Sequence, residues 1–155
     1  MPEVRINVAT APGELEAAYA IRREVFCREQ GVAEALEIDG RDGEARHYLV
    51  RAGGRPIGTA RVRTLAPGVA KIERVAVIAA RRGAGIGRRL MERILADLAA
   101  EGAASAVLHA QEYAAAFYAR LGFAVEGAPF EEAGIPHVRM RRPVAQAGGN
   151  EKSTP

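Results

Sequence analysis

A glycine-rich junction between a predicted strand and a predicted helix constrains this chain more than any other feature. Residues 69–78 carry alternating apolar side chains, as in a strand, and residues 88–101 place their apolar side chains on one helical face. The glycines between them are flanked by arginines, in the order Arg81, Arg82, Gly83, Gly85, Gly87, Arg88 and Arg89. A helix N-terminus presents unpaired N–H groups with partial positive charge, and glycines leave those groups uncovered. The junction therefore predicts a cradle for a phosphate or pyrophosphate group.

Two common nucleotide-binding loops fit this junction poorly. A P-loop requires a Lys and then a Ser or Thr directly after its last glycine, whereas Gly87 is followed by Arg88. A dinucleotide-binding turn has the spacing G-x-G-x-x-G near the first strand, whereas these glycines are spaced G-x-G-x-G and come late in the chain. A tight turn with solvent-exposed arginines is the alternative without a function, and the glycine pattern alone leaves it open.

The order of the predicted elements indicates a single-domain α/β fold. The order β-α-β-β-β-α-β-α-β-β predicts a mixed sheet of about six or seven strands with helices on both faces. The predicted strands cover residues 4–8, 47–52, 56–65, 69–78, 105–110, 123–125 and 137–140, and the predicted helices cover about 12–26, 88–101 and 113–121. We interpret residues 27–44 as an acidic loop with one short helical turn. The domain should cover residues 1–143, and the polar tail 144–155 should be disordered.

Composition excludes several other classes of protein. The 155 residues are 48% hydrophobic, yet no apolar run approaches the roughly 20 residues of a membrane helix, and the polar start is unlike a signal peptide. Cys27 is the single cysteine, so no internal disulfide can form and a reducing, cytoplasmic location is expected. The net charge is only +3, the arginines are interleaved with acidic residues, and aromatic residues make up 5%. Nucleic-acid binding is therefore disfavoured.

Two motifs in the right order and spacing make the chain resemble the GNAT acyltransferase superfamily. The matching segments are 72–77 for the strand pattern I-x-x-L-x-V, 82–87 for the signature R/Q-x-x-G-x-G/A, and 111–123 for N-x-x-A-x-x-x-Y-x-x-x-G-F. Gln111 stands where the family commonly has Asn. Two further segments, 26–32 and 133–137, are similar to the ElaA-like branch of the superfamily. The resemblance covers about residues 4–142, and it implies a GNAT-like fold.

The resemblance also implies that the chain binds acetyl-CoA as its acyl donor. The N–H groups of the glycine-rich turn would hold the pyrophosphate, and the strand at 75–77 would pair with the pantetheine amides. The Val77 N–H would then lie near the thioester carbonyl. The cofactor-binding residues that the resemblance implies are Val75, Ala76, Val77, Arg82, Gly83, Ala84, Gly85, Ile86, Gly87, Arg88, Gln111 and Tyr118. This expectation agrees with the phosphate cradle inferred from the glycines alone.

Acyl transfer to an amine also needs groups that move protons. The resemblance assigns Tyr118 as the general acid that protonates the leaving thiolate of coenzyme A, and core packing is the alternative role of its ring. Three residues are candidates for the base, and the sequence leaves the choice open between Glu73, Glu29 and His109. Each also has a purely structural interpretation, because Glu73 could pair with an arginine, Glu29 could be solvated and His109 could be a hydrogen-bonded core residue.

We therefore expect an acyl-CoA-dependent N-acyltransferase that carries acetyl to a primary amine of a small molecule or protein by direct transfer in a ternary complex. The expected acceptor-binding residues are Glu29, Gln30 and His137. Other acidic residues of the early loop could attract a cationic amine, although such charges are usually solvated, namely Glu34, Glu37, Asp39 and Asp42. No Cys or His spacing suits a metal site. A non-catalytic acyl-CoA sensor is the alternative class of protein. Dimers are common in the family that the chain resembles, so the resemblance leaves a homodimer open.

Overall fold

Residues 3–144 are described by the computed structural model, and they form eight strands and eight helical segments. In chain order these are β1 (Val4–Ala9), α1 (Pro12–Arg22), η1 (Arg23–Glu29), α2 (Glu34–Glu37), η2 (Asp42–Glu44), β2 (Arg46–Ala52), β3 (Arg55–Ala66), β4 (Val69–Val77), η3 (Ala79–Arg81), α3 (Ile86–Ala100), β5 (Ser105–Gln111), η4 (Glu112–Ala114), α4 (Ala115–Ala119), β6 (Ala124–Val125), β7 (Phe130–Glu132) and β8 (Ile135–Pro143). Most of the predicted tail, residues 145–155, lies outside the described part. Val144 is buried, and its N–H donates to the carbonyl oxygen of Ala104 at 2.9 Å.

The strands hydrogen-bond in the order β1-β2-β3-β4-β5-β8-β6, and β7 pairs with β8. The predicted α/β fold with a mixed sheet is confirmed, with eight strands where six or seven were expected. The additional strand is β7, three residues inside the segment interpreted as a Pro/Gly loop. The chain forms two compact units, residues 3–63 with 73–91 and residues 64–72 with 92–144. Within the described residues, no helix is both long enough and apolar enough to cross a membrane.

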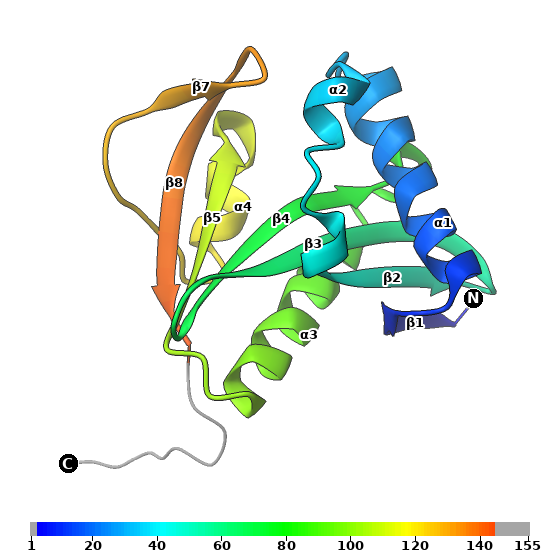
Figure 1. Ribbon diagram of the computed structural model, residues 1–155, viewed down its shortest axis with the longest axis horizontal. Coiled ribbons are helices and arrows are strands. Elements are labelled where there is room, and N and C mark those ends of the chain that lie inside the picture. The colour runs from blue at the N-terminus through cyan, green and yellow to red at the C-terminus, as the bar shows by residue number, and fades with distance from the viewer. Residues whose placement is uncertain (1–2, 145–155) are drawn as a thin grey trace. The chain divides into compact units, whose positions relative to one another are not determined.

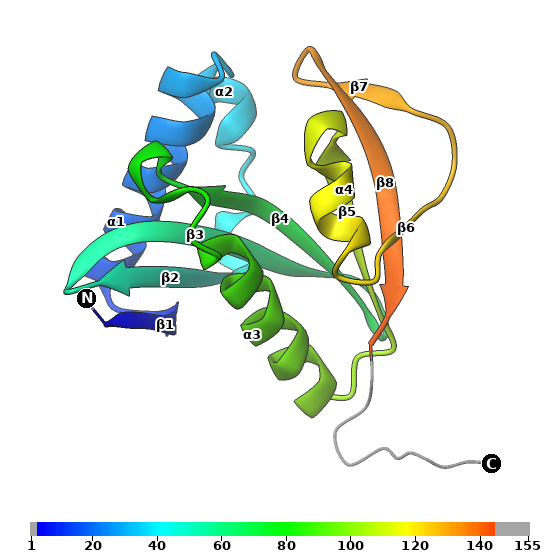
Figure 2. The same cartoon turned by 180° about the vertical axis from the view of Figure 1, so that it is seen from behind.

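In the first unit, β1, β2 and β3 form an antiparallel sheet between two helices. Gly53 and Gly54 connect β2 to β3 with φ values of 58° and 84°, the left-handed conformations that a tight hairpin turn requires. Helix α1 lies over one face of these strands and the start of α3 over the other (Figures 1 and 2). The largest apolar side chains that are fully buried in this unit are Tyr48, Leu49, Val50, Ile57, Leu90 and Met91. This core fixes the end of β4 and the turn that follows it.

The first helix changes its winding after Arg22 and continues as the π-helix η1. The N–H of Gln30 donates to the carbonyl oxygen of Val25 at 3.1 Å, five residues back, which is the spacing of a π-helix. The sequence pattern predicted one regular helix ending near residue 26, and that end point is wrong. Glu29 therefore closes a helical segment rather than lying in a loop.

A network of buried ion pairs fastens the segment from α2 to η2, called the acidic segment below. Arg22 is 1% exposed and donates to Glu37 from Nε and to Asp42 from Nη1, both at 2.7 Å. Arg61 is fully buried and contacts Asp39 at 2.8 Å and Asp42 at 3.0 Å. These acidic residues were expected to be solvated loop charges. They instead bind arginines of α1 and β3, because burying an arginine requires a carboxylate partner.

Strand β4 departs from regular alternation at Arg74, whose φ is +54°. The Arg74 guanidinium donates to Glu37 at 3.0 Å, and the preceding residue, Glu73, contacts Arg61 at 2.9 Å. Two consecutive side chains thus reach the same ion-pair network, whereas successive residues of a regular strand point to opposite faces. The simple expectation from strand alternation, that Glu73 and Val75 lie on one face, therefore does not apply at this point of β4.

The second unit is built on β5 and β8, which pair antiparallel without interruption along all of β5. Residues 69–72 of β4 pair parallel with β5, and β6 and β7 pair with β8. Ala133 and Gly134, with φ values of 53° and 74°, form the tight turn that folds β7 back onto β8. Helix α4 lies against β5 (Figures 1 and 2). The β7–β8 hairpin thus brings residues 130–132 beside residues near the end of β5.

Candidate active site

The glycine-rich turn leads from β4 through η3 into the N-terminus of α3. Gly83 and Gly85 have φ values of 83° and 79°, which explains why glycine occupies both positions. A Cβ added to either glycine would meet no atom within 4 Å, so the surface above the turn is open. The first hydrogen bond of the helix runs from the Arg89 N–H to the Gly85 carbonyl oxygen at 3.1 Å. The preceding N–H groups are those that a helix leaves for an anion.

Arg82 ties this turn to the end of η1. Its Nε donates to the carbonyl oxygen of Val77 at 2.9 Å, and its two terminal nitrogens bind both carboxylate oxygens of Glu29, with Nη2 and Oε1 2.7 Å apart. Hydrogen bonding to Arg82 lowers the pKa of Glu29, although burial acts weakly in the opposite direction. Gln30 follows directly at the end of η1. Arg82 therefore links Glu29 to Val77, and both Arg82 and Val77 are predicted cofactor-binding residues. Sequence spacing did not indicate the ion pair between Glu29 and Arg82.

Glu73, the second carboxylate proposed as a base, lies in the buried ion-pair network. Its Oε1 accepts from Nε of Arg63 at 2.7 Å and from Nε of Arg61 at 3.1 Å, and its Oε2 accepts from Nη2 of Arg63 at 3.1 Å. Its side chain is 8% exposed. The arrangement matches the structural interpretation given to Glu73 from the sequence, in which it pairs with neighbouring arginines.

The end of β4, which was expected to pair with the pantetheine arm, leads directly into the glycine-rich turn. Ala76 is buried, whereas Val75 and Val77 are partly exposed. Directly after the strand, the Ile78 N–H donates to the Ile57 carbonyl oxygen of β3 at 2.9 Å. The end of β4 is thus anchored by β3 immediately before the glycine-rich turn begins.

Tyr118 lies in α4 of the second unit, among aromatic side chains. Its ring meets Phe117 edge to face at 5.0 Å between centroids, and Phe123 at 6.1 Å. Burial raises the pKa of its phenol, and the nearby Tyr113 contributes in the same direction. A phenol with a raised pKa holds its proton at neutral pH. Tyr118 can therefore give a proton to a strongly basic group formed during a reaction.

His109 and His137 lie in one cluster of the second unit, joined by a phenylalanine that the sequence analysis did not select. The Phe130 ring meets His109 edge to face at 5.0 Å and stacks on His137 at 5.9 Å. Nδ1 of His109 is 2.9 Å from Oε1 of Glu132, and Gln111 pairs with His137 across β5 and β8. The structure thus brings His109, Gln111 and His137 together, and strand β7 places Phe130 and Glu132 beside them.

The described residues offer no metal site of three or more His, Cys, Asp or Glu side chains. Cys27 is partly buried in η1, and burial raises the pKa of its thiol, followed by repulsion from Glu37 and Glu34. A raised pKa disfavours the thiolate, which is the reactive form.

Comparison with known proteins identifies the family. Residues 9–143 match the family model described as acetyltransferase (GNAT) domain. The uncharacterized N-acetyltransferase YjcF of Bacillus subtilis is 36% identical over 136 residues, covering 87% of this chain and 96% of YjcF. The structure is similar to that of Escherichia coli ElaA, with a TM-score of 0.79, 30% identity and coverage of 92% and 99% of the two chains. An aminoglycoside 6'-N-acetyltransferase complexed with coenzyme A shares the fold, with a TM-score of 0.74, 16% identity and coverage of 92% and 98%. The chain therefore belongs to the GNAT acetyltransferase family.

Proposed function

We propose that this protein transfers the acetyl group of acetyl-CoA directly to a primary amine in a ternary complex. The observation that carries the proposal is the turn before α3, where both left-handed glycines face open space next to the N-terminus of a 15-residue helix, the kind of position that binds anions. Membership of the GNAT family supports acyl-CoA-dependent N-acyltransferase activity. A pyrophosphate suits this turn because it is an anion that short backbone N–H contacts can hold without a lysine.

The proposed reaction needs an electrophile held in place, an oxyanion stabilised and two protons moved. The end of β4 would align the pantetheine arm, with the Val77 N–H directed at the thioester carbonyl. A backbone donor that is already oriented stabilises the developing oxyanion without having to reorganise. Tyr118 would protonate the thiolate of coenzyme A as the C–S bond breaks, because its phenol carries a proton at neutral pH.

A non-catalytic acyl-CoA sensor is the alternative, and it would need the glycine-rich turn but no proton-transfer group. The buried phenol of Tyr118 favours the enzyme, since a sensor has no use for a proton donor at that position. The acceptor side is proposed to involve Glu29, Gln30 and His137. Glu37, Asp39 and Asp42 are removed from consideration as amine attractors because the buried Arg22 and Arg61 bind them, whereas Glu29 and its partner Arg82 are exposed.

A screen of primary amines with acetyl-CoA tests this function, with free thiol release as the readout. Tyr118→Phe keeps the ring that packs on Phe117 and Phe123 and removes only the hydroxyl. Turnover should fall by about 10²–10⁴ because the leaving thiolate loses its proton donor, while acetyl-CoA affinity is retained. Phe117→Leu is the control for ring packing. Wild-type turnover in Tyr118→Phe would return this residue to a packing role, and absence of any turnover in the wild type would favour the sensor.

A further inference from the structure

The three candidate bases occupy different environments. Both carboxylate oxygens of Glu73 accept hydrogen bonds from Arg63, and both oxygens of Glu29 are bound by Arg82. A carboxylate in such a pair must give up a charge-assisted contact before it can accept a proton, which makes it a poor base. His109, in contrast, has no hydrogen bond or ion pair to an arginine within residues 3–144.

The contact between His109 and Glu132 determines which ring nitrogen carries the proton. A carboxylate only accepts hydrogen bonds, and interaction with His109 lowers the pKa of Glu132, so that its carboxylate is ionised at neutral pH. Nδ1 must therefore be the donor in the 2.9 Å contact. In the neutral ring, Nε2 then carries the lone pair. The side chain of His109 is 21% exposed, so this ring is accessible to a small molecule.

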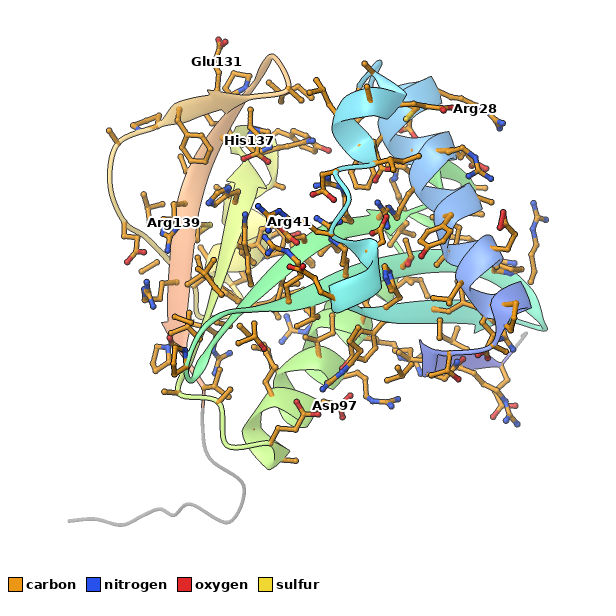
Figure 3. The ribbon with its side chains drawn as sticks, viewed as in Figure 1. Arg28, Arg41, Asp97, Glu131, His137 and Arg139 are labelled. Atoms are coloured by element: carbon orange, nitrogen blue, oxygen red, sulfur yellow. The ribbon has the colours of Figure 1, made fainter. Side chains whose placement is uncertain are left out.

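The β7–β8 hairpin fixes the orientation of the His109 ring. Phe130 and Glu132 are two residues apart on β7 and both contact His109, one at the ring edge and one at Nδ1. The residue between them, Glu131, projects away from the sheet at the end of the hairpin (Figure 3). Alternation along β7 thus separates one glutamate that holds the histidine from an adjacent glutamate that does not.

The strands next to His109 and Glu132 carry further charged or titratable residues. Arg139 is opposite His109 on β8, and its Nε donates to Glu126 at 2.8 Å (Figure 3). Nδ1 of His137 donates to the carbonyl oxygen of Ile135 at 2.7 Å, and Lys71 of β4 adds a favourable charge near Glu132. His109 is therefore the histidine of the cluster that is oriented by a carboxylate, whereas His137 is oriented by the backbone.

We propose that His109 is the general base of the acetyl transfer and that Glu132 is its positioning residue, an assignment that rests on the proposed function. The amine nitrogen forms the new C–N bond while its N–H bond breaks and the proton passes to Nε2 of His109. The C–S bond breaks, and the thiolate takes the proton of Tyr118. Glu132 fixes the tautomer that presents the Nε2 lone pair, and it stabilises the positive charge that the ring acquires.

Kinetics of four proteins test this assignment, namely the wild type, His109→Ala, Glu132→Gln and the matched control Glu131→Gln. Each is assayed with acetyl-CoA and, as probe amines, spermidine, tyramine, glucosamine and lysine amide. His109→Ala should lower kcat by about 10²–10⁴ without changing the melting-temperature shift caused by acetyl-CoA. Added imidazole should restore part of that kcat. Glu132→Gln should lower kcat by a smaller factor with little effect on the KM for the amine, and Glu131→Gln should match the wild type.

The outcomes separate this proposal from the function on which it rests. Wild-type kcat in His109→Ala would overturn the role of His109 and leave the acetyltransferase intact. A loss of kcat that imidazole does not restore, with an equal loss in Glu131→Gln, would show a structural effect of the hairpin and also overturn it. Where His109→Ala does not fold, Glu132→Gln against Glu131→Gln decides the question. Absence of wild-type turnover with every probe amine would overturn the proposed function and this assignment together.

Discussion

The acidic segment and the glycine-rich turn are both charged, glycine-containing loops of the first unit, and they serve opposite purposes. Gly40 in one and Gly85 in the other have the same φ of 79°, and a Cβ at either would meet no atom within 4 Å. The acidic segment leads into η2, a helical turn of three residues, whereas Gly85 precedes the 15 residues of α3. The carboxylates of the acidic segment are also paired with buried arginines. A left-handed glycine in open space thus suggests an anion site only where a long helix begins behind it.

The largest effect that separates the two regions should come from removing an arginine. Arg61→Met removes a buried guanidinium that contacts Asp39, Asp42 and Glu73, and it should destabilise the fold by about 3–5 kcal/mol. The matched change Arg88→Met, at an exposed position of the turn, should alter stability by only about 0.5 kcal/mol and weaken acetyl-CoA binding instead. Urea denaturation measures the stability of both variants. Equal losses of stability would contradict the division into a structural and a binding region.

Lowering the pH should weaken the acidic segment before it affects the glycine-rich turn. Hydrogen bonds from Arg61 lower the pKa of Asp39. Burial alone would raise the pKa of Asp42, but Arg22 and Arg61 outweigh it and lower it. A carboxylate with a lowered pKa stabilises the fold above its unfolded value of 3.8, and this stabilisation is lost as the pH falls through the folded pKa.

The melting temperature should therefore fall as the pH is lowered below about 4, more steeply in the wild type than in Asp39→Asn. The variant should already be less stable at pH 7, because Arg61 has lost a charged partner. Melting curves recorded between neutral and acidic pH give both quantities. Identical slopes for the two proteins would show that the Arg61–Asp39 pair does not contribute to acid sensitivity.

The local sequence pattern predicted those structural features that depend on residues close together in the chain. The strands and α3 follow from apolar periodicity, and the glycine-rich turn follows from alternating glycines before a helix. The ion-pair network joins residues far apart in sequence, from 10 residues for Arg63 and Glu73 to 37 for Arg74 and Glu37, and no local spacing signals such pairs. The acidic residues of the segment therefore looked like solvated charges, although tertiary packing buries their partners.

The candidate site, too, could be predicted from the sequence only in part. His109 was selected from the sequence, but its partner Glu132 is 23 residues away on a strand of three residues. That strand forms because the Ala133–Gly134 turn folds the chain back, with alanine in a conformation it seldom adopts. The π-helix η1 was equally hidden, because a segment of seven residues is too short for its wider hydrogen-bond spacing to show in the apolar pattern.

The effect of acetyl-CoA on melting of Gly85→Leu and Gly40→Leu tests the phosphate cradle most directly. Both substitutions force a side chain into the same left-handed conformation, so each should cost about 1–2 kcal/mol of stability. At a hundredfold excess over its dissociation constant, acetyl-CoA should add about 2.7 kcal/mol to the wild type and to Gly40→Leu. Gly85→Leu should gain nothing, because its side chain covers the N–H groups of α3. An undiminished gain in Gly85→Leu would contradict the assignment of this turn to coenzyme A.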